Sequence, residues 1–123
     1  MILGLRTFAV HVRPEQLDEA KAWYTQFAGV PPYFDQPFYV GFSVGGFELG
    51  LQPEGQPGPG GTVVYWGTDD IGTEVTRVVG LGATVVQPVQ DVGEGILVAT
   101  VADPFGNNVG LIQNPHFDPK AVK

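Results

Sequence analysis

Few residues of this chain could carry out chemistry, and their types limit the reactions to consider. The 123 residues include two His, 13 Asp or Glu, six Lys or Arg, and no Cys. Thiolate catalysis and a disulfide framework are therefore excluded. Ser43 is the only serine and lacks the motif that places a nucleophile on a sharp strand-to-helix turn. Carboxylates and imidazoles remain as candidates for proton transfer or metal binding.

Glu48 and His11 are the two candidate general bases. Glu48 lies in a strand-like run, residues 47–52, where it could bind a cationic group or remove a proton. The alternative is a solvated carboxylate on an edge strand. His11 could exchange a proton near neutral pH, or it could be a hydrogen-bonded histidine near a strand end. His116 lies beyond the last expected strand, where it is expected to help pack the tail.

Two acidic motifs are better explained by local structure than by a site. Asp69 and Asp70 precede an expected helix, where carboxylates cap free N–H groups and complement the helix dipole. Residues 103–107, DPFGN, are typical of a turn, since Pro fixes φ while Gly and Asn tolerate positive φ. The Gly-rich residues 58–61 and 93–95 lack the Lys and the strand–loop–helix context of a phosphate site.

Composition excludes several classes of partner. The formal net charge of −7 argues against binding to a nucleic-acid backbone. No apolar run reaches the ~20 residues of a membrane span. The first residues also lack the basic segment and cleavage site of a signal peptide. We expect a cytoplasmic protein with no nucleic-acid or membrane partner, folded as one domain with a real core.

The elements that must position these residues form a repeat. Residues 53–61 read PEGQPGPGG, and because seven of the nine are Gly or Pro they are expected to be a linker. This linker separates a first module, residues 1–52, from a second module, residues 62–115, and a tail follows at 116–123. Both modules show the pattern of a β-α-β-β-β unit.

The local signals agree between the two modules. In the first, alternation over residues 3–12 predicts a strand, and Pro14 and Gly29 bound a helix. In the second, the expected helix begins at Asp70 and ends at Gly82. Glycines 45 and 46 predict a hairpin turn between the last two strands of the first module. We expect three large aromatic side chains to be core: Trp23, Phe27 and Trp66.

This repeated unit resembles the vicinal oxygen chelate superfamily of glyoxalase I, bleomycin-resistance proteins and extradiol dioxygenases. The likeness is carried by AKAWY at 20–24, YWGTDDI at 65–71, GAT at 82–84 and ATVADPFGNN at 99–108. It implies an α+β fold in which two tandem βαβββ modules form curled mixed sheets around a cleft, with helices outside. It also implies a homodimer, and in many members a divalent metal held by the first and last strands of each module.

The metal-ligand positions implied by the resemblance are not filled by ligands. They fall on Thr7, Gly50, Val63 and Gly110, and Val and Gly have no ligating side chain. We therefore expect no metal and no other cofactor. A shifted register could instead pair His11 with Glu48, but two ligands from one module would make a weak site.

The favoured hypothesis is a metal-free, glyoxalase- and bleomycin-resistance-like protein that binds a small organic molecule in its cleft. The glycines are expected to leave room for a flat or partly apolar ligand, and this ligand could carry a cationic group. The expected cleft residues are Thr7, Tyr39, Glu48, Gly50, Val63, Tyr65 and Gly110. Two alternatives stay open, a metal-dependent lyase or dioxygenase and a metal-free isomerase that uses Glu48 or His11 as base. These residues therefore leave open whether the protein is an enzyme.

Overall fold

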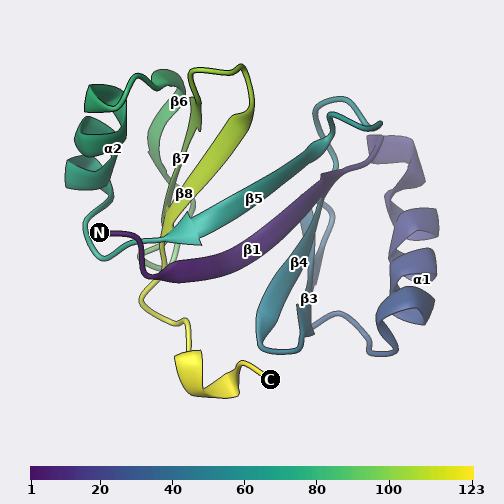
Figure 1. The fold of residues 1–123 in the computed structure, drawn as a ribbon. Coiled ribbons are helices and arrows are strands. Elements are labelled where there is room, and N and C mark those ends of the chain that lie inside the picture. Colours follow the sequence, from purple (N-terminus) through teal and green to yellow (C-terminus); the bar gives the residue numbers. More distant parts are fainter. The chain divides into compact units, whose positions relative to one another are not determined.

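The computed structural model describes residues 1–123, which divide into two compact units (Figure 1). Unit 1 comprises Met1–Arg6 and Val64–Phe117, and unit 2 comprises Thr7–Val63 and Asp118–Lys123. The first six residues therefore belong with the second module, and the end of the tail belongs with the first. No helix is long and apolar enough to cross a membrane.

Unit 2 contains the first module. Its elements are β1 (Gly4–His11), a short 3-10 helix η1 (Pro14–Gln16), α1 (Leu17–Ala28), β2 (Phe34–Gln36), β3 (Tyr39–Val44) and β4 (Phe47–Gln52). The strands lie in the order β2-β3-β4-β1. Strand β1 runs parallel to β4, and the other neighbours are antiparallel. A second 3-10 helix, η2 (Pro119–Ala121), lies in the tail.

Unit 1 repeats this arrangement with the second module. Its elements are β5 (Thr62–Gly67), α2 (Ile71–Gly80), β6 (Thr84–Asp91), β7 (Leu97–Ala102) and β8 (Asn108–Gln113). The strands lie in the order β5-β8-β7-β6, with β5 parallel to β8. Each unit is thus a mixed sheet with one helix, which confirms the expected α+β class and the repeated module.

Local signals explain where the elements begin and end. Gly29 ends α1 in the left-handed conformation, with φ of 76°, and its N–H donates to the Thr25 carbonyl. Gly45 and Gly46 have φ of 60° and 93° in the turn between β3 and β4. Such positive φ values at both positions suit a two-residue hairpin turn. The Asp70 side chain accepts a hydrogen bond from the Thr73 N–H at 3.1 Å and so caps α2 as expected.

Each helix covers one face of the sheet in its own unit. In unit 2, Leu17 packs with buried residues of the sheet, Val40, Phe42 and Leu51, and Ala20 and Tyr24 pack against this cluster. In unit 1, the core cluster is Ile71, Ala99 and Leu111. Apolar residues therefore alternate along the strands with residues on an opposite, helix-free face.

The expectation that Trp23, Phe27 and Trp66 are core residues is wrong. Trp23 is 57% exposed and Phe27 is 69% exposed, because α1 turns its Leu17, Ala20 and Tyr24 side to the core. Successive helix residues are about 100° apart, so Trp23 points away from the direction of Tyr24. Phe27 lies in the last turn of α1. Trp66 is 39% exposed, although its direct strand partner Leu111 belongs to the core cluster of unit 1.

Candidate functional site

Four of the predicted site residues lie on one face of the sheet in unit 2. In the β1–β4 register, Thr7 lies opposite Glu48 and Ala9 lies opposite Gly50. In the β3–β4 register, Gly41 lies opposite Gly50, so that Tyr39 shares this face. We define the Glu48 face as Thr7, Tyr33, Tyr39, Gly41, Glu48 and Gly50. It is the face opposite α1.

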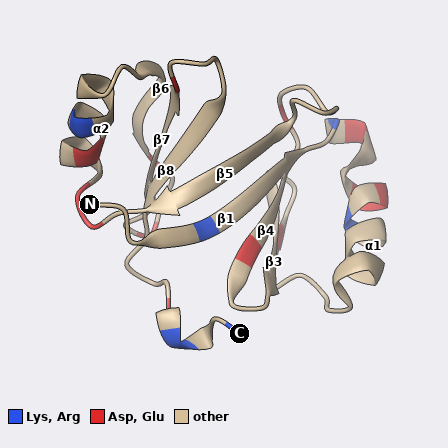
Figure 2. Cartoon of the chain, viewed as in Figure 1, with Lys and Arg blue, Asp and Glu red and all other residues tan.

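The Glu48 carboxylate is held by two hydroxyl groups. The Thr7 hydroxyl donates to Glu48 Oε1 at 3.2 Å, and the Tyr33 hydroxyl donates to Glu48 Oε2. Thr7 is buried, whereas Tyr33 is 64% exposed. Because β4 lies between β3 and β1, Glu48 is not on an edge strand, and that alternative is wrong. Glu48 is also the only charged residue of β3 and β4 (Figure 2).

A tyrosine occupies the space beside each of the two glycines that were expected at metal-ligand positions. A Cβ atom at Gly50 would overlap the Tyr39 hydroxyl and lie 2.6 Å from Tyr39 Cζ. A Cβ atom at Gly110 would lie 2.5 Å from Tyr65 Cδ1. The expectation that these glycines leave open room is therefore corrected, because aromatic rings fill it.

The remaining predicted residues lie apart from the Glu48 face. Tyr65 and Gly110 are direct strand partners in unit 1, and Val63 is buried in unit 2. His11 Nε2 lies 3.0 Å from Gln52 Oε1, and the His11 ring packs beside Gly55 rather than beside Glu48. The shifted-register pair of His11 with Glu48 is therefore not assembled.

The two motifs that sequence reasoning assigned to local structure have that role. Asp103 Oδ1 accepts hydrogen bonds from the N–H groups of Phe105 and Asn107, at 2.8 and 2.9 Å. These bonds, with the Asn107 backbone bond the largest cause, lower the pKa of Asp103. His116 Nε2 lies 2.8 Å from the Glu94 carbonyl oxygen, which ties residues near the tail to a loop of unit 1.

The repeated module agrees with comparison to known proteins. Residues 9–112 match the model of the family described as glyoxalase-like domain. The chain belongs to this glyoxalase-like family. No curated protein matches the sequence.

Solved structures support the fold of this glyoxalase-like domain at low identity. A glyoxalase/bleomycin resistance protein/dioxygenase superfamily member from Vibrio splendidus 12B01 is 15% identical, with a TM-score of 0.68, and the match covers 89% of this chain and 99% of that one. Methylmalonyl-CoA epimerase from Mycobacterium tuberculosis is 16% identical, with a TM-score of 0.64 and coverages of 97% and 91%. A Mn(II)-bound glyoxalase from Novosphingobium aromaticivorans is 16% identical, with a TM-score of 0.68 and coverages of 91% and 39%.

The residues of this glyoxalase-like domain do not fit a divalent metal centre. Such a centre needs several imidazole or carboxylate ligands. Glu48 is the one strong ligand on its face, and both of its oxygens accept hydrogen bonds from hydroxyl groups. Nowhere in the chain do three or more His, Cys, Asp or Glu side chains gather in a way that could hold a metal.

Tyr33 is a site residue that sequence reasoning missed. It lies 15 residues before Glu48, in the segment between α1 and β2, and its N–H donates to the Gly41 carbonyl at 2.9 Å. This backbone bond fixes Tyr33 beside β3, whose hairpin partner β4 carries Glu48. An aromatic residue directly after two prolines was the available signal, but only strand pairing shows where its hydroxyl lies.

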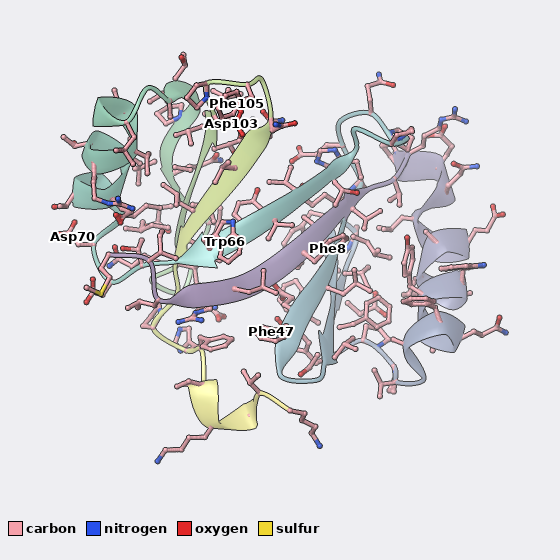
Figure 3. All side chains as sticks on the ribbon, viewed as in Figure 1. Phe8, Phe47, Trp66, Asp70, Asp103 and Phe105 are labelled. Atoms are coloured by element: carbon pink, nitrogen blue, oxygen red, sulfur yellow. The ribbon has the colours of Figure 1, made fainter.

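Two hollows of unit 2 lie along α1, and Glu48 is the one residue of the Glu48 face that borders either of them. The larger has a volume of 480 Å³ and is lined by Phe8 and Phe47 from the sheet (labelled in Figure 3), together with Trp23 and Phe27 from α1. The second has a volume of 360 Å³ and includes His11, Gln16 and Glu19. Both are lined in part by Trp23 and Tyr24. Unit 2 therefore has a polar face on one side of its sheet and an apolar groove on the other.

Proposed function

We propose that this glyoxalase-like protein binds a small organic molecule at the Glu48 face without a divalent metal. The observation that carries the proposal is the packing at Gly50, a position where a metal ligand was expected. The Tyr39 ring fills the space at Gly50, and the Glu48 carboxylate beside it is oriented by hydrogen bonds. The site therefore offers one negative charge and tyrosine rings instead of a ligand set.

The charge of Glu48 favours a cationic ligand. Its hydrogen-bond donors, Thr7 and Tyr33, are neutral, and no Lys or Arg forms an ion pair with it. A cationic group would complement the carboxylate, and aromatic rings beside it would add cation–π attraction. A ligand with a positive group on a flat or partly apolar body meets both conditions.

A second candidate function uses the same carboxylate as a general base. Hydrogen bonds from two hydroxyl groups fix the orientation of the Glu48 carboxylate. A carboxylate that acts as a general base must be held in a fixed orientation towards the proton it removes. In this version the protein is a metal-free isomerase of a small oxo-compound. Small oxo-compounds can be screened for turnover by the protein. Turnover that is lost in Glu48→Gln would favour the isomerase over binding alone.

Calorimetric titration with matched small ions tests the binding proposal. We expect benzyltrimethylammonium to bind in preference to phenylacetate, which has a similar ring but the opposite charge. Glu48→Gln should weaken binding of the cation by about tenfold or more, since a charge-assisted contact is lost. Glu54→Gln, at an exposed carboxylate of the linker, is the matched control and should leave the affinity unchanged.

Metal analysis tests whether the protein is free of a bound metal, as the proposal requires. Protein purified without chelator should contain no stoichiometric transition metal, and Mn²⁺ or Zn²⁺ should not raise its melting temperature. A stoichiometric metal that is lost in Glu48→Gln would show that the metal-free proposal is wrong. It would favour the metal-dependent lyase or dioxygenase instead.

A further inference from the structure

We propose that the groove between α1 and the sheet of unit 2 is a second ligand site, for a flat aromatic cation of small-molecule size. This α1 groove is lined by Phe8, Val10, Trp23, Phe27, Phe47 and Leu49, among others, and has a volume of 480 Å³. It lies on the helix side of the sheet, whereas the Glu48 face lies on the other side. The inference therefore goes beyond the proposed function.

The α1 groove presents aromatic rings to solvent. Trp23 and Phe27 stack on one another, with ring centroids 5.5 Å apart and an interplanar angle of 11°. Both are more than half exposed, and Phe8 on the facing strand is 45% exposed. Single exposed apolar side chains are common on protein surfaces, but a contiguous group of exposed rings usually marks a binding site.

The geometry of α1 explains why the groove is open. Leu17, Ala20 and Tyr24 bring the helix onto the core, while Trp23 and Phe27 lie along its flank. The strand residues Phe8 and Phe47 form the opposite wall (Figure 3). A volume of 480 Å³ lies within the range of about 300–1,000 Å³ that small-molecule sites occupy. Flat ligands would contact rings on both walls.

Charge selects which flat ligand the groove would take. The second hollow shares Trp23 and Tyr24 with the groove and continues it along α1 to Glu19. No Lys or Arg lines either hollow. Glu48 also borders the groove, but its carboxylate oxygens bond to Thr7 and Tyr33. The ring faces and the Glu19 carboxylate both favour a cation over an anion.

Tryptophan fluorescence can test the groove directly, because the chain has two tryptophans and one of them lines it. In a Trp66→Phe background, Trp23 is the only tryptophan. The probes are N-methylquinolinium, its neutral analogue 1-methylnaphthalene, and 1-naphthoate, which have similar ring systems and different charges. We expect saturable quenching of Trp23 with the affinity order cation, neutral, anion.

Two substitutions separate the ring contacts from the charge. Phe27→Ala removes one exposed ring and should weaken N-methylquinolinium binding by about three- to tenfold. Glu19→Gln should reduce only the preference for the cation over the neutral probe, by about two- to fivefold. Phe105→Ala, which truncates an exposed ring of unit 1, is the matched control and should change neither. Circular dichroism would confirm that each variant is folded.

Three outcomes would overturn the groove as a ligand site. In the first, quenching is not saturable or is unchanged by Phe27→Ala. In the second, binding is lost in Glu48→Gln and kept in Phe27→Ala, which would assign the cation to the Glu48 face alone. In the third, Trp23 emission follows protein concentration and Phe27→Ala converts a dimer to a monomer in sedimentation, so that a second copy covers the groove. Binding that needs Phe27 and survives Glu48→Gln would support two independent sites.

Discussion

At the scale of single residues, both modules pack a tyrosine ring against a glycine, but the tyrosine comes from a different neighbouring strand in each. Tyr39 comes from β3, the antiparallel neighbour of β4, and covers Gly50 from beside its direct partner Gly41. Tyr65 comes from β5, the parallel neighbour of β8, and lies directly opposite Gly110. In both modules the ring requires a residue without Cβ beneath it. Glycine is thus a packing requirement at these positions.

Substitution of Gly50 should show this requirement. In Gly50→Ala the new methyl group overlaps the Tyr39 hydroxyl, so we expect a loss of about 1–3 kcal/mol in the free energy of unfolding, measured in urea. Gly60→Ala is the control, because its Cβ would have no atom within 4 Å. Adding Tyr39→Ala should recover part of the loss, as expected for residues in contact. Equal losses for the two single glycine variants would contradict the account.

At the scale of elements, the two helices are stabilised differently. Asp70 caps α2 through the Thr73 N–H at 3.1 Å and the Thr73 hydroxyl at 2.9 Å. Helix α1 has no side-chain cap at Gln16. Gly72 weakens α2 locally, yet the helix forms because Ile71, Val75 and Val78 pack on the sheet of unit 1. Tertiary packing therefore outweighs local propensity in α2.

The cap can be tested with the neighbouring aspartate as its control. Asp70→Ala leaves the Thr73 N–H without its acceptor, so the melting temperature should fall by a few degrees. Asp69→Ala should have a smaller effect, because Asp69 makes no capping bond. A larger loss from Asp69→Ala would contradict the assignment of Asp70 as the cap of α2.

At the scale of the whole molecule, unit 1 contains three carboxyl groups with lowered pKa values. Hydrogen bonds from Thr73 lower the pKa of Asp70, and those from Asn107 and Phe105 lower the pKa of Asp103. The hydrogen bond from Arg77 is the largest cause that lowers the pKa of the buried Glu74. Each group favours the folded state when ionised. That contribution is complete above the pKa of the unfolded chain and is lost as pH falls through the folded-state pKa.

Acid should therefore destabilise unit 1. Because ordinary Asp and Glu pKa values are about 4, we expect the urea midpoint to fall progressively from about pH 5 towards pH 2. Trp66 reports on unit 1 when Trp23 is replaced by Phe, so its emission gives this midpoint separately. Asp103→Asn should make the pH dependence shallower. Equal midpoints at pH 6 and pH 3 would contradict the prediction.

The amino-acid sequence by itself determined the order of elements and the residue types at the positions where metal ligands were expected. Alternation along strands, Gly29 and Asp70 at helix ends, and the Gly45-Gly46 turn all act through neighbouring residues, so they can be read locally. The absence of ligating groups at Gly50 and Gly110 follows from residue type alone. Alternation with a period of two also placed Glu48 on the same strand face as Gly50. Only the strand registers bring Thr7 and Tyr39 to that face.

Only the tertiary structure decided what surrounds those positions. The rings over Gly50 and Gly110, the Tyr33 hydroxyl on Glu48, and the exposure of Trp23 and Phe27 all depend on contacts between elements. Strand pairing joins residues that are far apart in sequence, and the rotation of α1 about its axis selects which aromatic residues reach the core. Both are set by packing between elements, for which the spacing within one element carries no signal.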